Sequence, residues 1–272
     1  MAIYKPSELR AFLDSLGARA KKSLSQNFLI DGNIVKKIVQ LADLQPGDTV
    51  LEIGPGPGVL TEALLHRAKR VIAVEMDRLF ADALQRLSGV EITCGDILKF
   101  DMASLPEGTK VVANIPYHIT TPIIEQMVSS RRIHSATLMV QKELAERIVA
   151  KPATREFSSL ALFVQYHAKA KLGFLVPASC FYPKPKVESA VIRLDFSGPK
   201  KFPEITDDKA FEESFRKAFQ QRRKTLTASL KPLYPSESVL DALNAIKKPS
   251  TTRPEELLLE EWVALFCRLI DC

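Results

Sequence analysis

Apolar and polar positions along the first two thirds of the chain follow a pattern typical of strands that alternate with helices. Short apolar runs rich in Val, Ile and Leu predict buried strands, and segments with apolar residues three or four positions apart predict helices. The strands are predicted at 49–54, 70–77, 90–96, 110–116 and 136–142. The helices are predicted at 61–68, 78–87, 122–130 and 143–150. This alternation predicts a doubly wound α/β domain with a mostly parallel sheet and right-handed crossovers.

The pattern changes after residue 170. A weaker strand at 171–176 and a strong one at 189–196 have no helical pattern between them, which predicts an antiparallel hairpin at one edge of the sheet. Residues 197–203, "SGPKKFP", read as a linker. The predicted domains are therefore residues 1–198, with an N-terminal arm and helices over 1–47, and a small all-helical domain over 199–272.

The last helix is predicted to begin near Thr252, because Glu255 follows it at the spacing of a capping box. Its apolar face is predicted to contain Leu258, Trp262, Leu265, Phe266 and Leu269. We therefore expect Trp262 in the core of the helical domain.

Composition and charge narrow the class of protein. With 272 residues, 46% of them hydrophobic and 26% charged, the chain is an ordinary globular protein long enough for two domains. No apolar run approaches the ~20 residues that cross a bilayer, and the N-terminus has no secretory apolar region, so we expect a cytoplasmic protein with no membrane partner. The four cysteines have no CxxC or zinc-ligand spacing, so we expect reduced thiols and no metal.

The net charge of +6 permits binding to a polyanion. Residues 214–236 contain six cations and no acid, and the N-terminal arm adds a second basic cluster. The candidate RNA contacts from these two segments are Lys21, Lys22, Arg222, Arg223 and Lys224. Solvated helix faces are the alternative interpretation.

A glycine-rich turn and two acids predict a ligand pocket at the carboxyl ends of the strands. "LEIGPGPGVLT" (51–61) places Gly54 and Gly56 between the first strand and its helix, where a ligand can approach the backbone closely. The spacing matches neither a dinucleotide fingerprint nor an NTPase P-loop. Glu75 ends the second strand, where a carboxylate can accept both ribose hydroxyls, and Asp96 ends the third, where it can accept from an adenine amine.

Each acid alone is also explained as a cap on the following helix. Together with the glycine turn they describe a pocket for an adenosine with no pyrophosphate to neutralise, which suits S-adenosylmethionine.

"NIPY" (114–117) ends the fourth strand, beside that pocket. The Asn114 side-chain oxygen and the Pro116 carbonyl can accept the two hydrogens of an adenine amine and direct the nitrogen lone pair at the methyl group. Tyr117 offers a ring against which an extruded base can stack. From "CFYPKPKV" (180–187), Phe181 is a candidate for the other face of the base, with core packing as the alternative, and Lys184 and Lys186 are candidates for phosphate contacts.

These segments resemble the KsgA-type family of ribosomal RNA adenine N6,N6-dimethyltransferases over nearly the whole chain. The matching motifs are "KKSLSQNFLID" (21–31), "EIGPGPGVLT", "VIAVEMD", "CGDIL", "NIPYHIT" and "FYPKPKVESAV". The resemblance implies a Rossmann-like methyltransferase sheet, S-adenosylmethionine as cofactor, and Phe181 and Tyr117 on either side of the target adenine. The resulting set of expected donor-binding residues is Gln26, Asn27, Leu29, Gly54, Gly56, Glu75, Met76, Asp96, Ile97 and Asn114.

The resemblance also implies the substrate, a pair of adjacent adenosines near the 3′ end of small-subunit rRNA, presented within a nearly assembled subunit, and a role in subunit biogenesis. We expect a monomer. The alternatives are a large-subunit rRNA adenine methyltransferase of the macrolide-resistance type, against which "FQQRRKTLTASL" (219–230) and "TTRPEELLLEEW" (251–262) stand, and a non-catalytic rRNA-binding assembly factor on the same fold.

Overall fold

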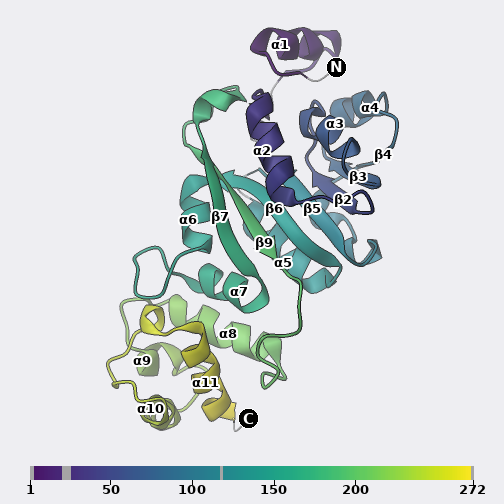
Figure 1. Cartoon of the computed structure of the whole chain (residues 1–272). Coiled ribbons are helices and arrows are strands. Elements are labelled where there is room, and N and C mark those ends of the chain that lie inside the picture. The colour runs from purple at the N-terminus through teal and green to yellow at the C-terminus, as the bar shows by residue number, and fades with distance from the viewer. Residues whose placement is uncertain (1–2, 20–25, 117–118, 271–272) are drawn as a thin grey trace. The chain divides into compact units, whose positions relative to one another are not determined.

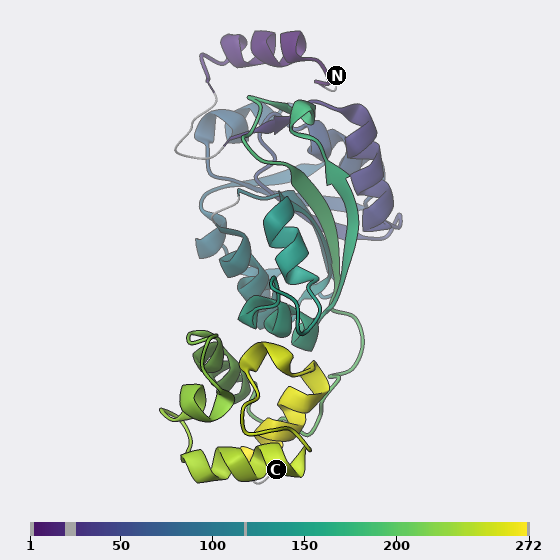
Figure 2. The same ribbon diagram turned by 90° about the vertical axis from the view of Figure 1, so that its left-hand side faces the viewer.

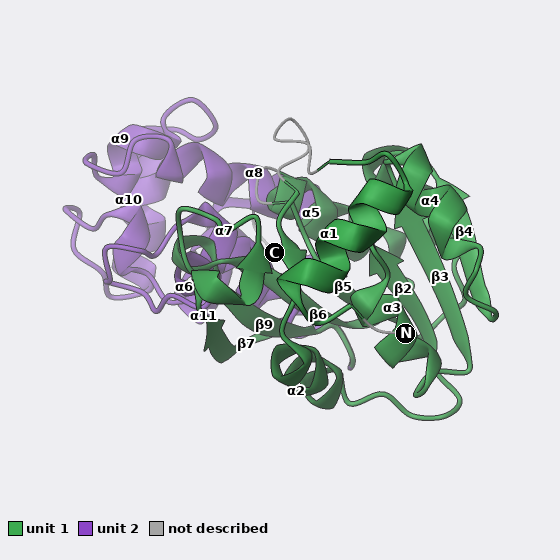
Figure 3. Ribbon diagram, turned by 90° about the horizontal axis from the view of Figure 1, so that it is seen from above, with its two compact units in different colours: residues 1–145, 170–197 green, residues 146–169, 198–272 purple. Residues whose placement is uncertain are grey.

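A computed structural model describes residues 3–19, 26–116 and 119–270 (Figure 1). The chain divides into two compact units. Unit 1 contains residues 1–145 and 170–197, and unit 2 contains residues 146–169 and 198–272 (Figure 3). None of the helices in the described ranges has the length and apolar content that a bilayer crossing requires.

Unit 1 is built on a seven-stranded sheet with the order β4-β3-β2-β5-β6-β9-β7. Its strands are β2 (Thr49–Ile53), β3 (Arg70–Glu75), β4 (Val90–Cys94), β5 (Thr109–Asn114), β6 (Ile133–Gln141), β7 (Lys169–Val176) and β9 (Ser189–Asp195). The strands β4, β3, β2, β5 and β6 are parallel, and β9 is antiparallel to β6. The predicted mostly parallel α/β fold with antiparallel pairing toward one edge is therefore confirmed.

Helices cover both faces of this sheet, and Figures 2 and 3 show α2 and α5 on opposite faces. The helices of unit 1 are α1 (Pro6–Ser15), α2 (Gly32–Ala42), α3 (Val59–Leu65), α4 (Arg78–Leu84) and α5 (Thr120–Ser130), with the short 3₁₀ helices η2 (Ile97–Lys99), η3 (Met102–Ser104) and η5 (Ala178–Cys180). A separate two-stranded sheet pairs β1 (Phe28–Leu29) with β8 (Phe181–Tyr182). The helix α6 (Lys142–Ile148) crosses the boundary between the units.

Local sequence explains where these helices begin and which face they bury. The Asp31 carboxylate accepts the Asn33 N–H at 2.8 Å and caps α2, whose Val35 and Ile38 are buried against the sheet. The Asp77 carboxylate caps α4 in the same way. Isolated helices of this length are marginally stable in water, so these helices depend on their caps and on the burial of one apolar face against the sheet.

Unit 2 is helical and has its own aromatic core. Its elements are α7 (Ser159–His167), α8 (Asp208–Phe219), α9 (Leu226–Leu230), α10 (Ser236–Ala245), η6 (Pro254–Glu256) and α11 (Leu259–Ile270). Trp262 is 1% exposed, its indole N–H donates to the Pro254 carbonyl at 3.2 Å, and its ring packs against Phe215 and Phe219. The prediction that Trp262 is a core residue is confirmed.

The structure differs from two sequence predictions here. Residues 146–169 belong to the helical unit, whereas the predicted boundary at residue 198 placed them in the first domain. The last helix begins at Leu259 and not near Thr252, because the segment forms two separate helices, η6 and α11, each with its own capping carboxylate. The Glu256 carboxylate accepts the Arg253 N–H at 2.7 Å, and the Glu261 carboxylate accepts the Leu258 N–H at 2.9 Å.

As a consequence, Leu258 lies before the helix and is half exposed, and Thr252 donates its hydroxyl to the Pro249 carbonyl without capping a helix. The apolar face that α11 buries contains Leu259, Trp262, Val263, Leu265 and Phe266.

Candidate functional site

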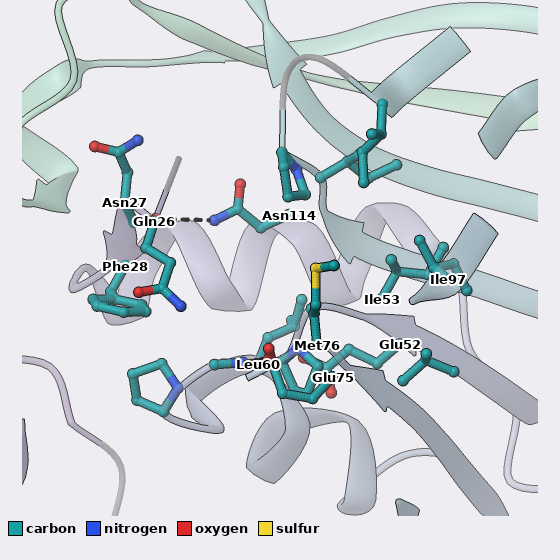
Figure 4. Close-up of a pocket in the computed structure, with 18 of the residues that line it drawn as sticks. Gln26, Asn27, Phe28, Glu52, Ile53, Leu60, Glu75, Met76, Ile97 and Asn114 are labelled. Carbon is teal, nitrogen blue, oxygen red and sulfur yellow. Dashed lines mark hydrogen bonds between the residues drawn. The ribbon is translucent and has the colours of Figure 1, made fainter. Parts of the chain in front are cut away.

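A pocket of about 250 Å³ opens at the carboxyl ends of β2, β3, β4 and β5 (Figure 4). Four parallel strands end at the same edge of the sheet, so the residues that follow them line one cavity. All ten residues predicted to bind the donor line this pocket. They are Gln26, Asn27, Leu29, Gly54, Gly56, Glu75, Met76, Asp96, Ile97 and Asn114.

The glycine turn between β2 and α3 requires glycine for two different reasons. Gly54, Gly56 and Gly58 all have positive φ, at 66°, 54° and 87°. A Cβ on Gly54 would meet no atom within 4 Å, so this glycine leaves open space on the pocket wall. A Cβ on Gly58 would lie 2.6 Å from the Leu84 side chain, so Gly58 allows α3 to pack closely against α4. The turn therefore combines an open wall for a ligand with tight packing beneath it.

Glu75 is held in one orientation by the backbone. Its two carboxylate oxygens accept the Gly56 N–H at 2.9 Å and the Asp77 N–H at 2.8 Å. Burial raises the pKa of this carboxyl, and the two N–H groups partly offset that rise. Each oxygen keeps a second lone pair, so a fixed carboxylate at this position can accept two hydroxyl groups.

Asp96 caps a helix and also lies on the pocket wall. Its carboxylate accepts the Leu98 N–H at 3.0 Å and caps η2, and it also lines the pocket. The two residues that follow the acids differ in exposure, since Met76 is 58% exposed and Ile97 is buried. Together they give the pocket apolar surface next to two carboxylates, which fits a flat ring that carries polar edges.

Asn114 is oriented by the segment that contains β1. Its side-chain Nδ2 donates to the Asn27 carbonyl at 3.3 Å, as the dashed line in Figure 4 shows. A carbonyl can only accept, so the amide nitrogen must face Asn27 and the side-chain oxygen is left as an acceptor. The Pro116 carbonyl accepts the Ile119 N–H at 3.2 Å and retains a second lone pair. Asn114 and Pro116 both line the pocket, and each has an oxygen that can accept a further hydrogen bond.

The two predicted aromatic residues have different outcomes. Tyr117 lies outside the described residues. Phe181 is 3% exposed, pairs with Leu29 in the β1–β8 sheet and belongs to the hydrophobic core. It does not line the pocket. In this structure Phe181 packs in the core cluster beside Leu29, and its place on one face of the target base stays a prediction.

The predicted RNA-binding residues that the structure describes are not among those that line the pocket. Lys184 and Lys186 are exposed in the loop between β8 and β9. The turn between α8 and α9 carries a cluster that we call the basic turn, formed by Arg222, Arg223 and Lys224. Arg222 is tethered, since its guanidinium donates to the Arg155 carbonyl at 3.1 Å. Lys21 and Lys22 lie outside the described residues.

Sequence reasoning missed one buried acid on the pocket wall. Glu52 lies within β2, is 1% exposed and lines the pocket. Burial raises its pKa to about 8, the Thr61 hydroxyl partly offsets this rise, and the Glu75 carboxylate adds to it. The signal was present in "TVLEIG", where a charged residue interrupts a run that otherwise reads as a buried strand. The remaining lining residues that were not predicted are mostly apolar, among them Phe28, Ile53, Leu60, Leu98 and Ile115.

No group of three or more His, Cys, Asp or Glu residues in the described ranges could hold a metal ion.

Comparisons with known proteins point in one direction. Residues 17–268 match the family described as ribosomal RNA adenine dimethylase. The ribosomal RNA small subunit methyltransferase A of Protochlamydia amoebophila is 46% identical over 281 residues, covering 99% of this chain and 98% of that protein. The protein of the same name from Chlamydia muridarum is 44% identical, with 100% of both chains covered.

Two solved structures of RNA-modifying methyltransferases share the fold of this chain. A dimethyladenosine transferase from Plasmodium falciparum superposes with a TM-score of 0.78 at 28% identity, covering 90% of this chain and 98% of that one. The 23S rRNA methyltransferase ErmE superposes with a TM-score of 0.69 at 29% identity, covering 90% of this chain and 100% of that one.

Proposed function

The chain belongs to the ribosomal RNA adenine dimethylase family, and on that premise we propose that it dimethylates the exocyclic amines of two adjacent adenosines near the 3′ end of small-subunit rRNA. Family membership makes it an rRNA adenine dimethyltransferase. Two full-length relatives named for the small subunit support that choice of ribosomal subunit. The single observation that carries the chemistry is the convergence of the glycine turn, two acids and Asn114 on one pocket.

We propose that this pocket binds S-adenosylmethionine, which supplies a methyl group on a positively charged sulfur. Glu75 would accept the ribose hydroxyls and Asp96 the adenine amine, with Met76 and Ile97 against the ring. The open wall at Gly54 and the buried acid Glu52 support a ligand that carries a positive charge and lies against the backbone. The residues present therefore fit this cofactor.

On the target side, Asn114 and Pro116 would hold the adenine amine. Its lone pair is delocalised into the ring, so the nitrogen is a poor nucleophile until two acceptors on its hydrogens make it more tetrahedral. The Asn114 side-chain oxygen and the second lone pair of the Pro116 carbonyl are two such acceptors. They would also stabilise the positive charge that develops on nitrogen during transfer. We keep stacking of the base on Tyr117 as a prediction.

For the second methylation the amine has one hydrogen fewer, so one of these two acceptors loses its partner. We propose that the Pro116 carbonyl tolerates this loss, since it already accepts the Ile119 N–H.

We propose that the basic turn of unit 2 and the lysines of the β8–β9 loop contact the rRNA backbone, within a nearly assembled small subunit. Support comes from their exposure and from the net charge of +6. We also propose that the protein acts as a monomer in the cytoplasm and contributes to subunit biogenesis.

Two alternatives are less well supported. A large-subunit specificity is suggested by the likeness to ErmE, but the dimethyladenosine transferase superposes better and the full-length relatives are named for the small subunit. A purely structural assembly factor has no need of a pocket in which every predicted donor residue is present.

The test is transfer of labelled methyl groups to small subunits that lack the modification, followed by nucleoside analysis. We expect dimethyladenosine. Asn114→Ala should abolish most of the transfer while retaining much of the affinity for RNA. Equal losses of transfer and RNA affinity would contradict the role given to Asn114, and labelling of large subunits instead would favour the first alternative.

A further inference from the structure

Glu52 is a buried carboxyl group that the proposed reaction does not use. It lies in β2 between Ala73 of β3 and Val112 of β5 and is 1% exposed. In the described structure its Oε2 makes no hydrogen bond of ordinary geometry, and the neighbouring Thr61 hydroxyl only partly offsets the rise in its pKa. A buried carboxyl group with so little hydrogen bonding is costly to ionise, and since Glu52 lines the pocket, a ligand of suitable charge bound there would offset that cost.

The charge balance of the pocket indicates the sign of that ligand. Its described lining includes three acids, Glu52, Glu75 and Asp96, and no Lys, Arg or His. Three carboxyl groups in one small cavity without a counter-cation repel one another when ionised. The pocket is therefore built for a ligand that brings positive charge.

The groups that face Glu52 from neighbouring elements strengthen this conclusion. Glu75 on β3 is an acid, and α3 presents the uncharged Thr61 hydroxyl. Lys110 on β5 and Arg70 on β3 are each held in an ion pair with a carboxylate elsewhere. Glu62 on α3 lines a separate groove. Burial and Glu75 together raise the pKa of Glu52 to about 8, so in the absence of a ligand the group is mostly protonated at neutral pH.

The position of Glu52 in the sheet identifies which positive charge it would meet. Glu75, assigned to the ribose, ends β3, and Asn114, assigned to the target amine, ends β5. The strand between them is β2, which carries Glu52. In S-adenosylmethionine the sulfur is bonded to the ribose and bears the methyl that the target amine receives, so it must lie between those two groups, over the end of β2.

We propose that Glu52 is uncharged while the donor is absent and ionises when the donor binds, so that it recognises the positive charge on the donor sulfur. The proton leaves the Glu52 carboxyl for the solvent, and the resulting carboxylate is compensated by the sulfonium. The product S-adenosylhomocysteine has no charge on sulfur and would leave Glu52 protonated. Glu52 would thereby favour donor over product, a specificity that rests on the proposed use of this donor.

Calorimetric titration in buffers of different ionisation enthalpy measures the protons released on binding and needs no turnover. At pH 7 we expect S-adenosylmethionine to release more than about half a proton through Glu52, and S-adenosylhomocysteine to release much less. Between pH 6 and pH 7, donor affinity should tighten by close to tenfold, as expected for a group that must lose one proton.

The variant Glu52→Gln keeps the shape of the side chain but has no proton to lose. It should release equal numbers of protons with both ligands, and its donor affinity should change little between pH 6 and pH 7. The α-amino group of either ligand titrates in the same way in both proteins and therefore cancels in the comparison. Glu62→Gln is the matched control, an acid-to-amide change in α3 outside this pocket, and it should behave like the wild type.

Equal proton release with both ligands in the wild-type protein would overturn the inference, whether or not the variant folds. So would a difference between the ligands that persists in Glu52→Gln. If the wild-type protein did not bind S-adenosylmethionine at all, the proposed function would fail, and this result is distinct from binding without differential proton release.

Discussion

Replacing Glu52 by Gln is expected to stabilise the unliganded protein at neutral pH and to remove part of its loss of stability as pH rises. The carboxyl group has a pKa of about 8 in the folded protein, against 4.5 for an ordinary Glu. Because the folded state holds the proton more tightly, the penalty is absent below about pH 4.5, grows between there and about pH 8, and is complete above that. In the variant this penalty does not exist.

The magnitude follows from the width of this pH window. Within it, each pH unit costs roughly 1.4 kcal/mol of the free energy of unfolding, so the step from pH 5.5 to pH 7.5 costs on the order of 2–3 kcal/mol. The wild-type protein should lose this amount relative to Glu52→Gln over that step.

Urea unfolding followed by circular dichroism at pH 5.5 and pH 7.5 provides the measurement. Glu107→Gln, an exposed acid in the same unit, controls for the loss of one negative charge and should leave the pH dependence unchanged. If the wild type and Glu52→Gln kept the same difference in stability at both pH values, Glu52 would be ionised in the folded protein, and the burial argument would be refuted.

Three further predictions follow from packing and charge. Gly58→Ala should lower the free energy of unfolding by about 1–3 kcal/mol, because the new Cβ would lie 2.6 Å from the Leu84 side chain. Gly108→Ala is the control, since Gly108 also has a positive φ but lies in open space, and this change should cost less. Equal losses of stability in urea unfolding would mean that backbone strain alone accounts for both. Lys110→Met should lower the free energy of unfolding by about 1–3 kcal/mol in the same assay, because it removes the ion pair of 2.8 Å between Lys110 and Asp48 and leaves the half-buried Asp48 carboxylate without its cation. An unchanged stability would mean that solvent replaces the ion pair. Neutralising the basic turn should weaken rRNA binding and reduce the slope of affinity against salt concentration, and an unchanged slope would make it a solvated surface.

The sequence was sufficient to predict which residues line the pocket of unit 1 at the ends of the parallel strands. Each predicted strand of the parallel part appears in the structure, and the residues at the ends of four of them line one pocket. This succeeds because a buried strand has a continuous apolar signature, and because parallel strands in one sheet bring their carboxyl ends to the same edge. Gly54, Glu75, Asp96 and Asn114 could therefore be grouped without knowing any distance.

Where the sequence was not sufficient, a distant segment determined the outcome. Phe181 carries no local mark that predicts its surroundings, and its pairing with Leu29, some 150 positions earlier, places it in the core cluster. Residues 146–169 have an ordinary helical pattern, and only their contacts assign them to unit 2. The last helix was predicted to begin too early because three acids each follow a possible N-cap residue by three positions. These pairs are Thr252 with Glu255, Arg253 with Glu256, and Leu258 with Glu261, and the sequence does not distinguish among them.

The chain by itself thus determined which segments form strands and helices and which chemical groups stand at their ends, because hydrogen bonding and side-chain alternation are properties of neighbouring residues. Only the tertiary structure decided the strand order β4-β3-β2-β5-β6-β9-β7, the burial of Phe181 and the raised pKa of Glu52. These depend on groups far apart in the sequence, since desolvation and electrostatic interaction are sums over everything that surrounds a residue in space.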